Sequence, residues 1–264
     1  TGHAVLQSRP VFAVGKRGTP SSYLILNGDT PLLREATVRE LLRVHEAERA
    51  TVTILTAMLE DASGYGRVVR AHSAERAVSR IVEDRDANAE EQAIREINVG
   101  TYVVDGEFLF STLEKLDPSN SQGEYYLTDI IRLAEHSGRR VATVVLDKPD
   151  EGLGVNTRRQ LAEAEQVVRQ QIRDRWLDAG VTMIDPASTW IDAAVTIGRD
   201  TVLYPNVTLE GTTVIGEDCV LRSFTRLTDC IVGNGVKILD HCLFTASHIE
   251  DDAHLGPFVH LRPG

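Results

Sequence analysis

The spacing of apolar residues along the chain changes near Asp185. Before that point, apolar runs predict strands at 22–26, 51–58, 102–104 and 140–146, and amphipathic segments predict helices at 37–47, 128–137 and 157–177. Thr37 and Glu40 predict a capping box at the start of the first of these helices. Strands that alternate with helices favour a mostly parallel sheet covered by helices. We therefore expect an α/β domain first.

After Asp185 the helical pattern ends and an apolar residue recurs about every six positions. The repeat runs through Ile197, Leu203, Leu209, Ile215, Leu221, Leu227, Val232, Ile238, Phe244, Ile249, Leu255 and Leu261, with a five-residue interval before Val232 and before Ile249. A hexapeptide repeat predicts a parallel β-helix, whose triangular coils each point one apolar residue per strand inward. We expect glycine or small residues at the corners, where positive φ costs little. An ordinary sheet of short strands is the alternative.

Composition narrows the possible partners. The 264 residues are 42% hydrophobic and 25% charged, which is typical of a globular protein. No apolar run approaches the roughly 20 residues that span a bilayer, and the first residues lack a signal-peptide pattern, so we expect a cytoplasmic protein without a membrane partner. The net charge of −11 disfavours nucleic acid as a partner. Cys219, Cys230 and Cys242 form no C-x-x-C pair and are expected to be buried, reduced thiols.

The strongest local signal for chemistry is the segment Asn27-Gly28-Asp29, which ends an apolar strand. In open α/β sheets, ligands bind at the carboxyl ends of the strands. A carboxylate at that end, preceded by a glycine that lets a ligand approach, suits Mg²⁺, which prefers oxygen ligands. The same pattern is also typical of a turn aspartate, so Asp29 alone does not decide between the two interpretations.

Further short motifs follow in a fixed order. They are TGHA at 1–4, GYGR at 64–67, Glu83-Asp84, EINVG at 96–100, QGEYYLTD at 122–129 and GVN at 154–156. Each is a common loop sequence, but their joint order resembles sugar-1-phosphate nucleotidyltransferases. QGEYYLTD, the hexapeptide tail and the closing GPFVHLRPG at 256–264 make the chain similar to bacterial bifunctional N-acetylglucosamine-1-phosphate uridylyltransferase/glucosamine-1-phosphate acetyltransferases.

That resemblance implies a fold and a domain plan. It implies a Rossmann-like nucleotide-diphospho-sugar transferase domain, here incomplete, followed by a left-handed parallel β-helix of hexapeptide repeats. The corresponding division is a uridylyltransferase domain over 1–156, a linker helix over 157–184, and the start of an acetyltransferase domain over 185–264.

The resemblance also implies roles for individual residues. Asp29 and Asn156 are similar to the family's Mg²⁺ ligands, and Asn156 also to a substrate contact. Contacts to the nucleotide-sugar are implied for Thr1 and Gly66, to the amino-sugar for Glu83 and Asn98, and to a sugar phosphate in the acetyltransferase half for Arg262. Asn27 stands where the family usually has Tyr, which leaves its substrate contact open. No catalytic role is implied for the cysteines or His3.

The implied reaction is uridylyl transfer from UTP to N-acetylglucosamine 1-phosphate, which feeds peptidoglycan and lipopolysaccharide synthesis. Such a transfer needs positioning and charge neutralisation by Mg²⁺ rather than a protein nucleophile. For a full-length parent, the resemblance further implies acetylation of glucosamine 1-phosphate by acetyl-CoA and a homotrimer formed through the β-helix.

The family's Gly-rich phosphate loop and its acetyltransferase histidine do not occur in these 264 residues. We therefore expect a fragment with little or no activity of its own, from an active parent. His241, His248, His254 and His260 recur in the repeat and are expected at surface or corner positions. Two alternatives remain: a single-function sugar-1-phosphate nucleotidyltransferase with a hexapeptide tail, and an inactive chain that serves only as an oligomerisation or regulatory partner.

Overall fold

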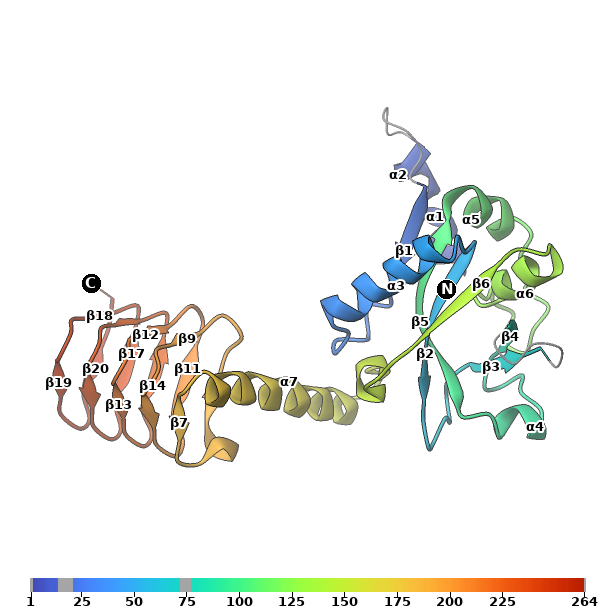
Figure 1. Ribbon diagram of the computed structural model, residues 1–264. Helices are drawn as coiled ribbons and strands as arrows, with labels where there is room; N and C mark the ends of the chain where they lie inside the picture. The colour runs from blue at the N-terminus through green and yellow to red at the C-terminus, as the bar shows by residue number, and fades with distance from the viewer. Residues whose placement is uncertain (1, 14–20, 72–76, 264) are drawn as a thin grey trace. The chain divides into compact units, whose positions relative to one another are not determined.

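The computed structural model describes residues 2–13, 21–71 and 77–263. The chain forms two compact units, Thr1–Gln160 and Leu161–Gly264 (Figure 1). Among the described residues, no helix combines the length and the apolar character needed to cross a bilayer. The finer division at 156 and 184 stays a prediction.

The first unit is built on a six-stranded sheet with the order β4-β3-β5-β2-β6, and β1 also pairs with β5. The strands are β1 (Ser22–Ile25), β2 (Val52–Met58), β3 (Arg67–Arg70), β4 (Val78–Val82), β5 (Glu96–Asp105) and β6 (Val141–Val145). Among the described strands of this sheet, only the β2–β6 pair is parallel. Strands β1, β2 and β3 all run antiparallel to β5, and β3 runs antiparallel to β4. The expectation of a mostly parallel sheet is therefore wrong, and the sheet is mixed. The hairpin β3–β4, which the hydrophobic pattern did not reveal, supplies antiparallel strands without a crossover helix.

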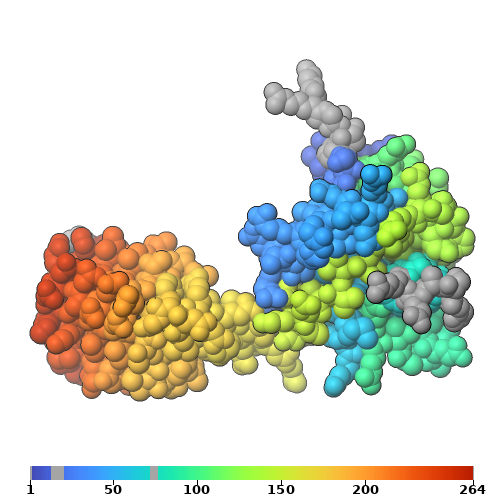
Figure 2. Space-filling view, in the orientation of Figure 1, coloured from blue at the N-terminus to red at the C-terminus, as the bar shows by residue number. Residues whose placement is uncertain are grey.

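Helices cover both faces of this sheet. They are α1 (Gly2–Gln7), α2 (Arg9–Ala13), α3 (Glu35–Ala47), α4 (Ala89–Gln92), α5 (Gly106–Leu113), α6 (Asp129–His136) and the 3₁₀ turn η1 (Pro149–Gly152). Residues alternate along β2: Leu55 joins the core beneath Leu41 of α3, and Ile54 joins the core with α5 and α6. In Figure 2 the blue residues of α3 lie over one face of the unit.

The start of α3 corrects the expected capping box. The helix begins at Glu35, and its N-cap, Arg34, makes no side-chain cap bond. Thr37 lies inside the first turn, and its hydroxyl donates to Glu151 instead. A capping box does occur in α4, where Asn88 and Glu91 satisfy one another's backbone N–H groups.

The second unit is a parallel β-helix of about four turns. The long helix α7 (Arg158–Asp178) precedes it, and Ile172 and Trp176 of α7 pack against the β-helix core. The strands form three sheets, ordered β19-β16-β13-β10-β7, β20-β17-β14-β11-β8 and β18-β15-β12-β9. Their bounds are β7 (Thr182–Met183), β8 (Trp190–Ile191), β9 (Thr196–Ile197), β10 (Val202–Leu203), β11 (Thr208–Glu210), β12 (Val214–Ile215), β13 (Val220–Leu221), β14 (Arg226–Thr228), β15 (Ile231–Val232), β16 (Lys237–Ile238), β17 (Leu243–Thr245), β18 (His248–Ile249), β19 (His254–Leu255) and β20 (His260–Leu261); the 3₁₀ turn η2 (Pro186–Ser188) lies between β7 and β8. The expected Rossmann-like domain followed by a left-handed β-helix is confirmed.

The twelve repeat residues all lie on strands and pack into one column per sheet. Leu209, Leu227 and Phe244 stack in consecutive coils, and each is fully buried. The five-residue interval before Val232 shortens the coil without disturbing the ladder, since β12 still pairs with β15 in register. The hexapeptide prediction therefore identified the core of this unit.

The corners differ from the expectation of glycine and small residues. Positive φ is adopted chiefly by polar and aromatic residues, including Asn206, Phe224, His241 and Phe258. Phe224, His241 and Phe258 occupy the same corner in successive coils, and their rings stack at centroid distances of 4.9 and 5.1 Å. His241 is therefore a corner residue, as expected.

Gly211 and Gly235 turn the chain with positive φ, but Gly216 has a different role. Gly216 has no positive φ, but a Cβ there would lie 2.5 Å from the backbone oxygen of Gly233 in the next coil. A missing side chain thus permits the close approach of adjacent coils. The three cysteines are free and buried in the same core, as predicted.

Candidate active site

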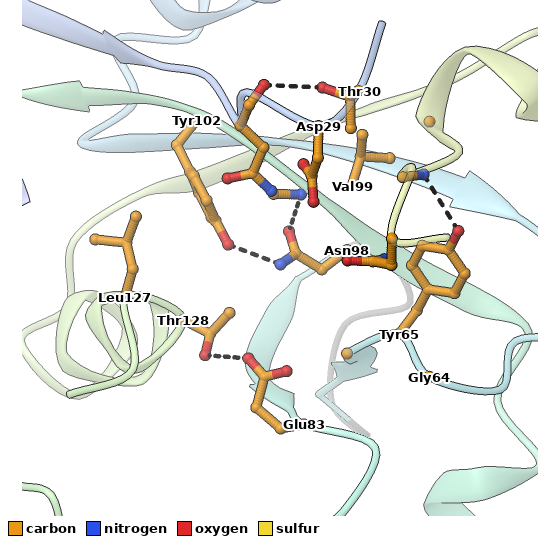
Figure 3. A pocket seen from close by; sticks show the side chains of 16 residues that line it. Asp29, Thr30, Gly64, Tyr65, Glu83, Asn98, Val99, Tyr102, Leu127 and Thr128 are labelled. Carbon is orange, nitrogen blue, oxygen red and sulfur yellow. Dashed lines mark hydrogen bonds between the residues drawn. The ribbon is translucent and has the colours of Figure 1, made fainter. Parts of the chain in front are cut away.

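A pocket in the first unit collects most of the residues that the motifs singled out (Figure 3). It encloses about 220 Å³, and its lining includes Asn27, Asp29, Gly66, Glu83, Asn98 and Asn156. These six residues come from segments spread over 130 positions of the chain, and the fold brings all of them together. The volume is below the roughly 300 Å³ at the lower end of small-molecule sites.

One residue of the predicted set lies elsewhere, and the position of another is not described. Thr1 falls outside the described residues. Arg262 belongs to the second unit, where it is exposed near the end of the last coil. It therefore does not line the pocket of the first unit.

Asp29 and Asn156 approach one another from two loops. Asp29 follows β1, and Asn156 lies between η1 and α7. The backbone N–H of Val155 donates to the carbonyl oxygen of Asp29 over 2.8 Å. A Cβ built on Gly154 would lie 3.8 Å from Asp29 Oδ2 and 3.7 Å from Asn156 Nδ2, so both side chains surround the same point.

This donor set fits Mg²⁺. One carboxylate and one amide supply oxygen ligands, once the Asn156 amide is turned so that its oxygen faces the ion. Mg²⁺ commonly takes one or two protein ligands and completes its shell with water and substrate phosphate. The described residues contain no cluster of three His, Cys, Asp or Glu side chains suited to a metal. A site with these two protein ligands suits an ion that is also bound by water or by a phosphate-bearing ligand.

Glu83 forms the opposite wall of the pocket. Thr128 Oγ1 donates to Glu83 Oε1 over 2.9 Å, while Oε2 faces Gly66, where an added Cβ would lie 3.4 Å away. Burial raises the pKa of the Glu83 carboxyl, partly offset by the Thr128 hydrogen bond. Gly66 thus leaves room for a carboxylate that accepts hydrogen bonds from a polar ligand.

Asn98 is held in a fixed orientation by its neighbours. Its Nδ2 donates to the hydroxyl of Tyr102 over 2.7 Å, and its Oδ1 accepts the N–H of Gly100 over 3.1 Å. Gly100 has a φ of +84°, and a Cβ there would lie 2.1 Å from Asn27 Nδ2. The glycine of the EINVG motif thus lets β5 bulge and lets Asn27 pack against it.

Sequence reasoning missed three side chains that hold other parts of the pocket in place by hydrogen bonds. Tyr102 is 2% exposed and orients Asn98, while Thr128 orients Glu83. The hydroxyl of Tyr65 accepts the N–H of Gly154 over 3.4 Å and so links the GYGR loop to the Asn156 loop. Tyr65 and Thr128 lie within quoted motifs, which was the available signal. Tyr102 was assigned only to a strand.

Similarity to known protein families defines the class of this protein. A family model described as nucleotidyl transferase matches residues 1–184. The chain belongs to this family, in agreement with the mixed α/β sheet and the pocket at the end of β1.

Individual relatives make the resemblance more specific. The bifunctional protein GlmU of Shouchella clausii (strain KSM-K16) is 43% identical over 264 residues, covering 100% of this chain and 57% of that protein. Proteins of the same name from Geobacillus sp. (strain WCH70) and Trichlorobacter lovleyi are 45% and 46% identical, with coverage of 100% and 56%. The resemblance inferred from the motifs is confirmed. The chain spans a little over half the length of these relatives.

Proposed function

We propose that the first unit belongs to an enzyme that transfers uridylyl from UTP to N-acetylglucosamine 1-phosphate, forming UDP-N-acetylglucosamine and pyrophosphate. The observation that supports this most directly is the meeting of Asp29 and Asn156 in one pocket with Glu83 and Asn98. The match of residues 1–184 to the nucleotidyl transferase family supports the same class of reaction.

In this proposal the pocket acts by positioning. Asp29 and Asn156 hold Mg²⁺, which when bound neutralises phosphate charge. Glu83 accepts a hydrogen bond from the amino-sugar, and Thr128 fixes the direction of its carboxylate. Asn98, locked by Tyr102, keeps one N–H and one lone pair for the sugar. Gly66 gives the ligand access to backbone at the GYGR turn. Alignment of the sugar phosphate with the α-phosphorus then supplies most of the rate enhancement.

The second unit suggests the wider role of the complete gene product. We propose that this product also acetylates glucosamine 1-phosphate from acetyl-CoA, with Arg262 as a sugar-phosphate contact. We further propose a homotrimer formed through the β-helix, whose exposed apolar residues include Phe224, Ile231 and Phe258. Three buried free thiols fit a reducing compartment such as the cytoplasm.

The test measures pyrophosphate release from UTP and N-acetylglucosamine 1-phosphate with Mg²⁺, in the complete gene product and in the 264-residue chain. We expect activity in the complete product and little in the shorter chain. Acceptance of other sugar phosphates, with none of N-acetylglucosamine 1-phosphate, would instead support a single-function nucleotidyltransferase.

The site assignment has a separate test. In the complete product, Asp29→Ala is expected to abolish uridylyl transfer and to leave acetyl transfer unchanged, because the two reactions use different units. Equal loss of both activities would refute the assignment of one activity to each unit.

A further inference from the structure

A buried carboxylate outside the pocket connects the two loops that carry Asp29 and Asn156. Glu151 lies in η1, five residues before Asn156, and its side chain is 4% exposed. Arg34 lies at the start of α3, five residues after Asp29. An ion pair joins Glu151 to Arg34, so it ties together the segments that the pocket needs side by side.

Both oxygens of Glu151 accept hydrogen bonds. Arg34 Nε donates to Oε1 over 2.7 Å, and a second guanidinium nitrogen donates to the same oxygen. Thr37 Oγ1 donates to Oε2 over 2.5 Å, and the backbone N–H of Arg34 lies 3.4 Å from that oxygen. Burial by itself raises the pKa of Glu151, but the bonds from Arg34 and Thr37 outweigh it and hold the pKa below its ordinary value. The carboxylate is therefore charged at neutral pH.

The turn that carries Glu151 has little freedom to move independently. A Cβ on the adjacent Gly152 would lie 2.8 Å from Val99 Cγ2 and 3.0 Å from Leu146 Cδ1, so the turn is packed tightly against the sheet. Three residues further on, the N–H of Val155 bonds the carbonyl oxygen of Asp29. The turn of Glu151 is thus linked to Asn156 along the backbone and to Asp29 through this hydrogen bond.

We propose that Glu151 is a positioning residue for the metal site, which holds the Asp29 loop and the Asn156 loop at the separation that places both side chains around one ion. This inference rests on the proposed function. Mg²⁺ requires near-octahedral ligands at about 2.0–2.1 Å, so small errors in loop placement weaken binding. Substitution of residues that support metal ligands typically weakens metal affinity about 10–100-fold.

The chain offers a matched control for the test variant. Glu151→Gln keeps the shape of the side chain but removes its charge and one acceptor. In the second unit, Glu210 accepts two bonds of 2.7 Å from Arg226 and one of 2.8 Å from Thr228. Glu210→Gln therefore removes the same kind of Arg–Glu–Thr contact away from the pocket. Arg34→Ala, alone and combined with Glu151→Gln, tests whether both residues act through one contact.

Two readouts in the complete gene product separate positioning from general stability. The first is amide hydrogen exchange at Val155, and the second is the Kd of Mn²⁺, measured by electron paramagnetic resonance with UDP-N-acetylglucosamine present. We expect Glu151→Gln to accelerate exchange at Val155 and to raise the Kd about tenfold or more. Arg34→Ala and the double variant should match it, and Glu210→Gln should change neither readout. If Glu151→Gln folds poorly, Thr37→Val is a milder variant, because it removes only one hydroxyl. We expect it to accelerate exchange at Val155 and to raise the Kd, each by a smaller amount.

Each contrary result has a distinct meaning. Unchanged exchange at Val155 would show that Glu151 does not join the loops and would overturn the proposal. Faster exchange with an unchanged Kd would reduce the contact to a structural one and overturn it equally. If the wild-type protein binds Mn²⁺ no better than its Asp29→Ala variant, the proposed function fails. Val155 exchange would then still decide whether Glu151 joins the loops.

Discussion

The β-helix core can be tested by removing one inward side chain, and Phe244→Ala is the most informative choice. Phe244 is fully buried and stacks between Leu227 and Leu261 of the neighbouring coils. Truncation of a buried Phe typically costs about 3–5 kcal/mol. With a urea dependence of about 2 kcal/mol per M, the unfolding midpoint of this unit should fall by about 2 M.

Tryptophan fluorescence is a selective assay for this unit. Both tryptophans of the chain, Trp176 and Trp190, belong to the second unit, and Trp176 packs against its core. The matched control is Leu243→Ala on the same strand, because Leu243 points outward and is 39% exposed. Its effect should stay within about 0.5 kcal/mol.

Two results would contradict this reasoning. Equal midpoint shifts for Phe244→Ala and Leu243→Ala would refute the assignment of inward and outward positions. A Phe244→Ala midpoint that does not move would show that the coil of Phe244 unfolds separately from the coils near the tryptophans, as nearest-neighbour models of repeat proteins allow.

Two further predictions concern pH and backbone approach. Burial lowers the pKa of His45, whose ring bonds Thr53 at 2.9 Å, so the unfolded chain binds this proton more tightly than the folded chain. The stability of the first unit should therefore fall as pH drops below about 6.5, and thermal melts of wild type and His45→Asn by circular dichroism should show a smaller loss in the variant. In the 264-residue chain, Gly216→Ala should destabilise the second unit strongly because its Cβ would lie 2.5 Å from the next coil, whereas a Cβ on Gly256, in the last coil of this chain, would meet nothing within 4 Å. Equal urea midpoints for the two glycine variants would contradict that account.

The sequence was most informative about the β-helix, where each apolar side chain of the repeat fills one inward position. Each inward residue of the β-helix recurs at a nearly constant interval, so the repeat could be assigned residue by residue. The direction of β5 could not be predicted, because strand pairing depends on contacts far apart in the chain. Glycine was expected at corners in general, but Gly216 permits the close approach of adjacent coils, which local φ preferences do not encode.

The residues of the pocket were also predicted only in part. Asp29 was found because a polar segment ends an apolar run, whereas Glu83 was assigned from the resemblance carried by the ordered motifs. Tyr102 was assigned to a strand without a role, since an aromatic residue in a strand is typical of a core. Glu151 belongs to no motif and becomes visible only when α3 and η1 lie together.

The shortened coils have a consequence for how this unit tolerates change. Val202 pairs with Val220 eighteen residues later, but Val220 pairs with Lys237 after only seventeen, and the inward column stays aligned. The corner near Asp229 therefore absorbs a single-residue deletion without shifting the ladder. The number of residues in a coil can therefore change without changing which strands pair. Whole coils can thus be gained or lost as units while the remaining hydrophobic column keeps its alignment.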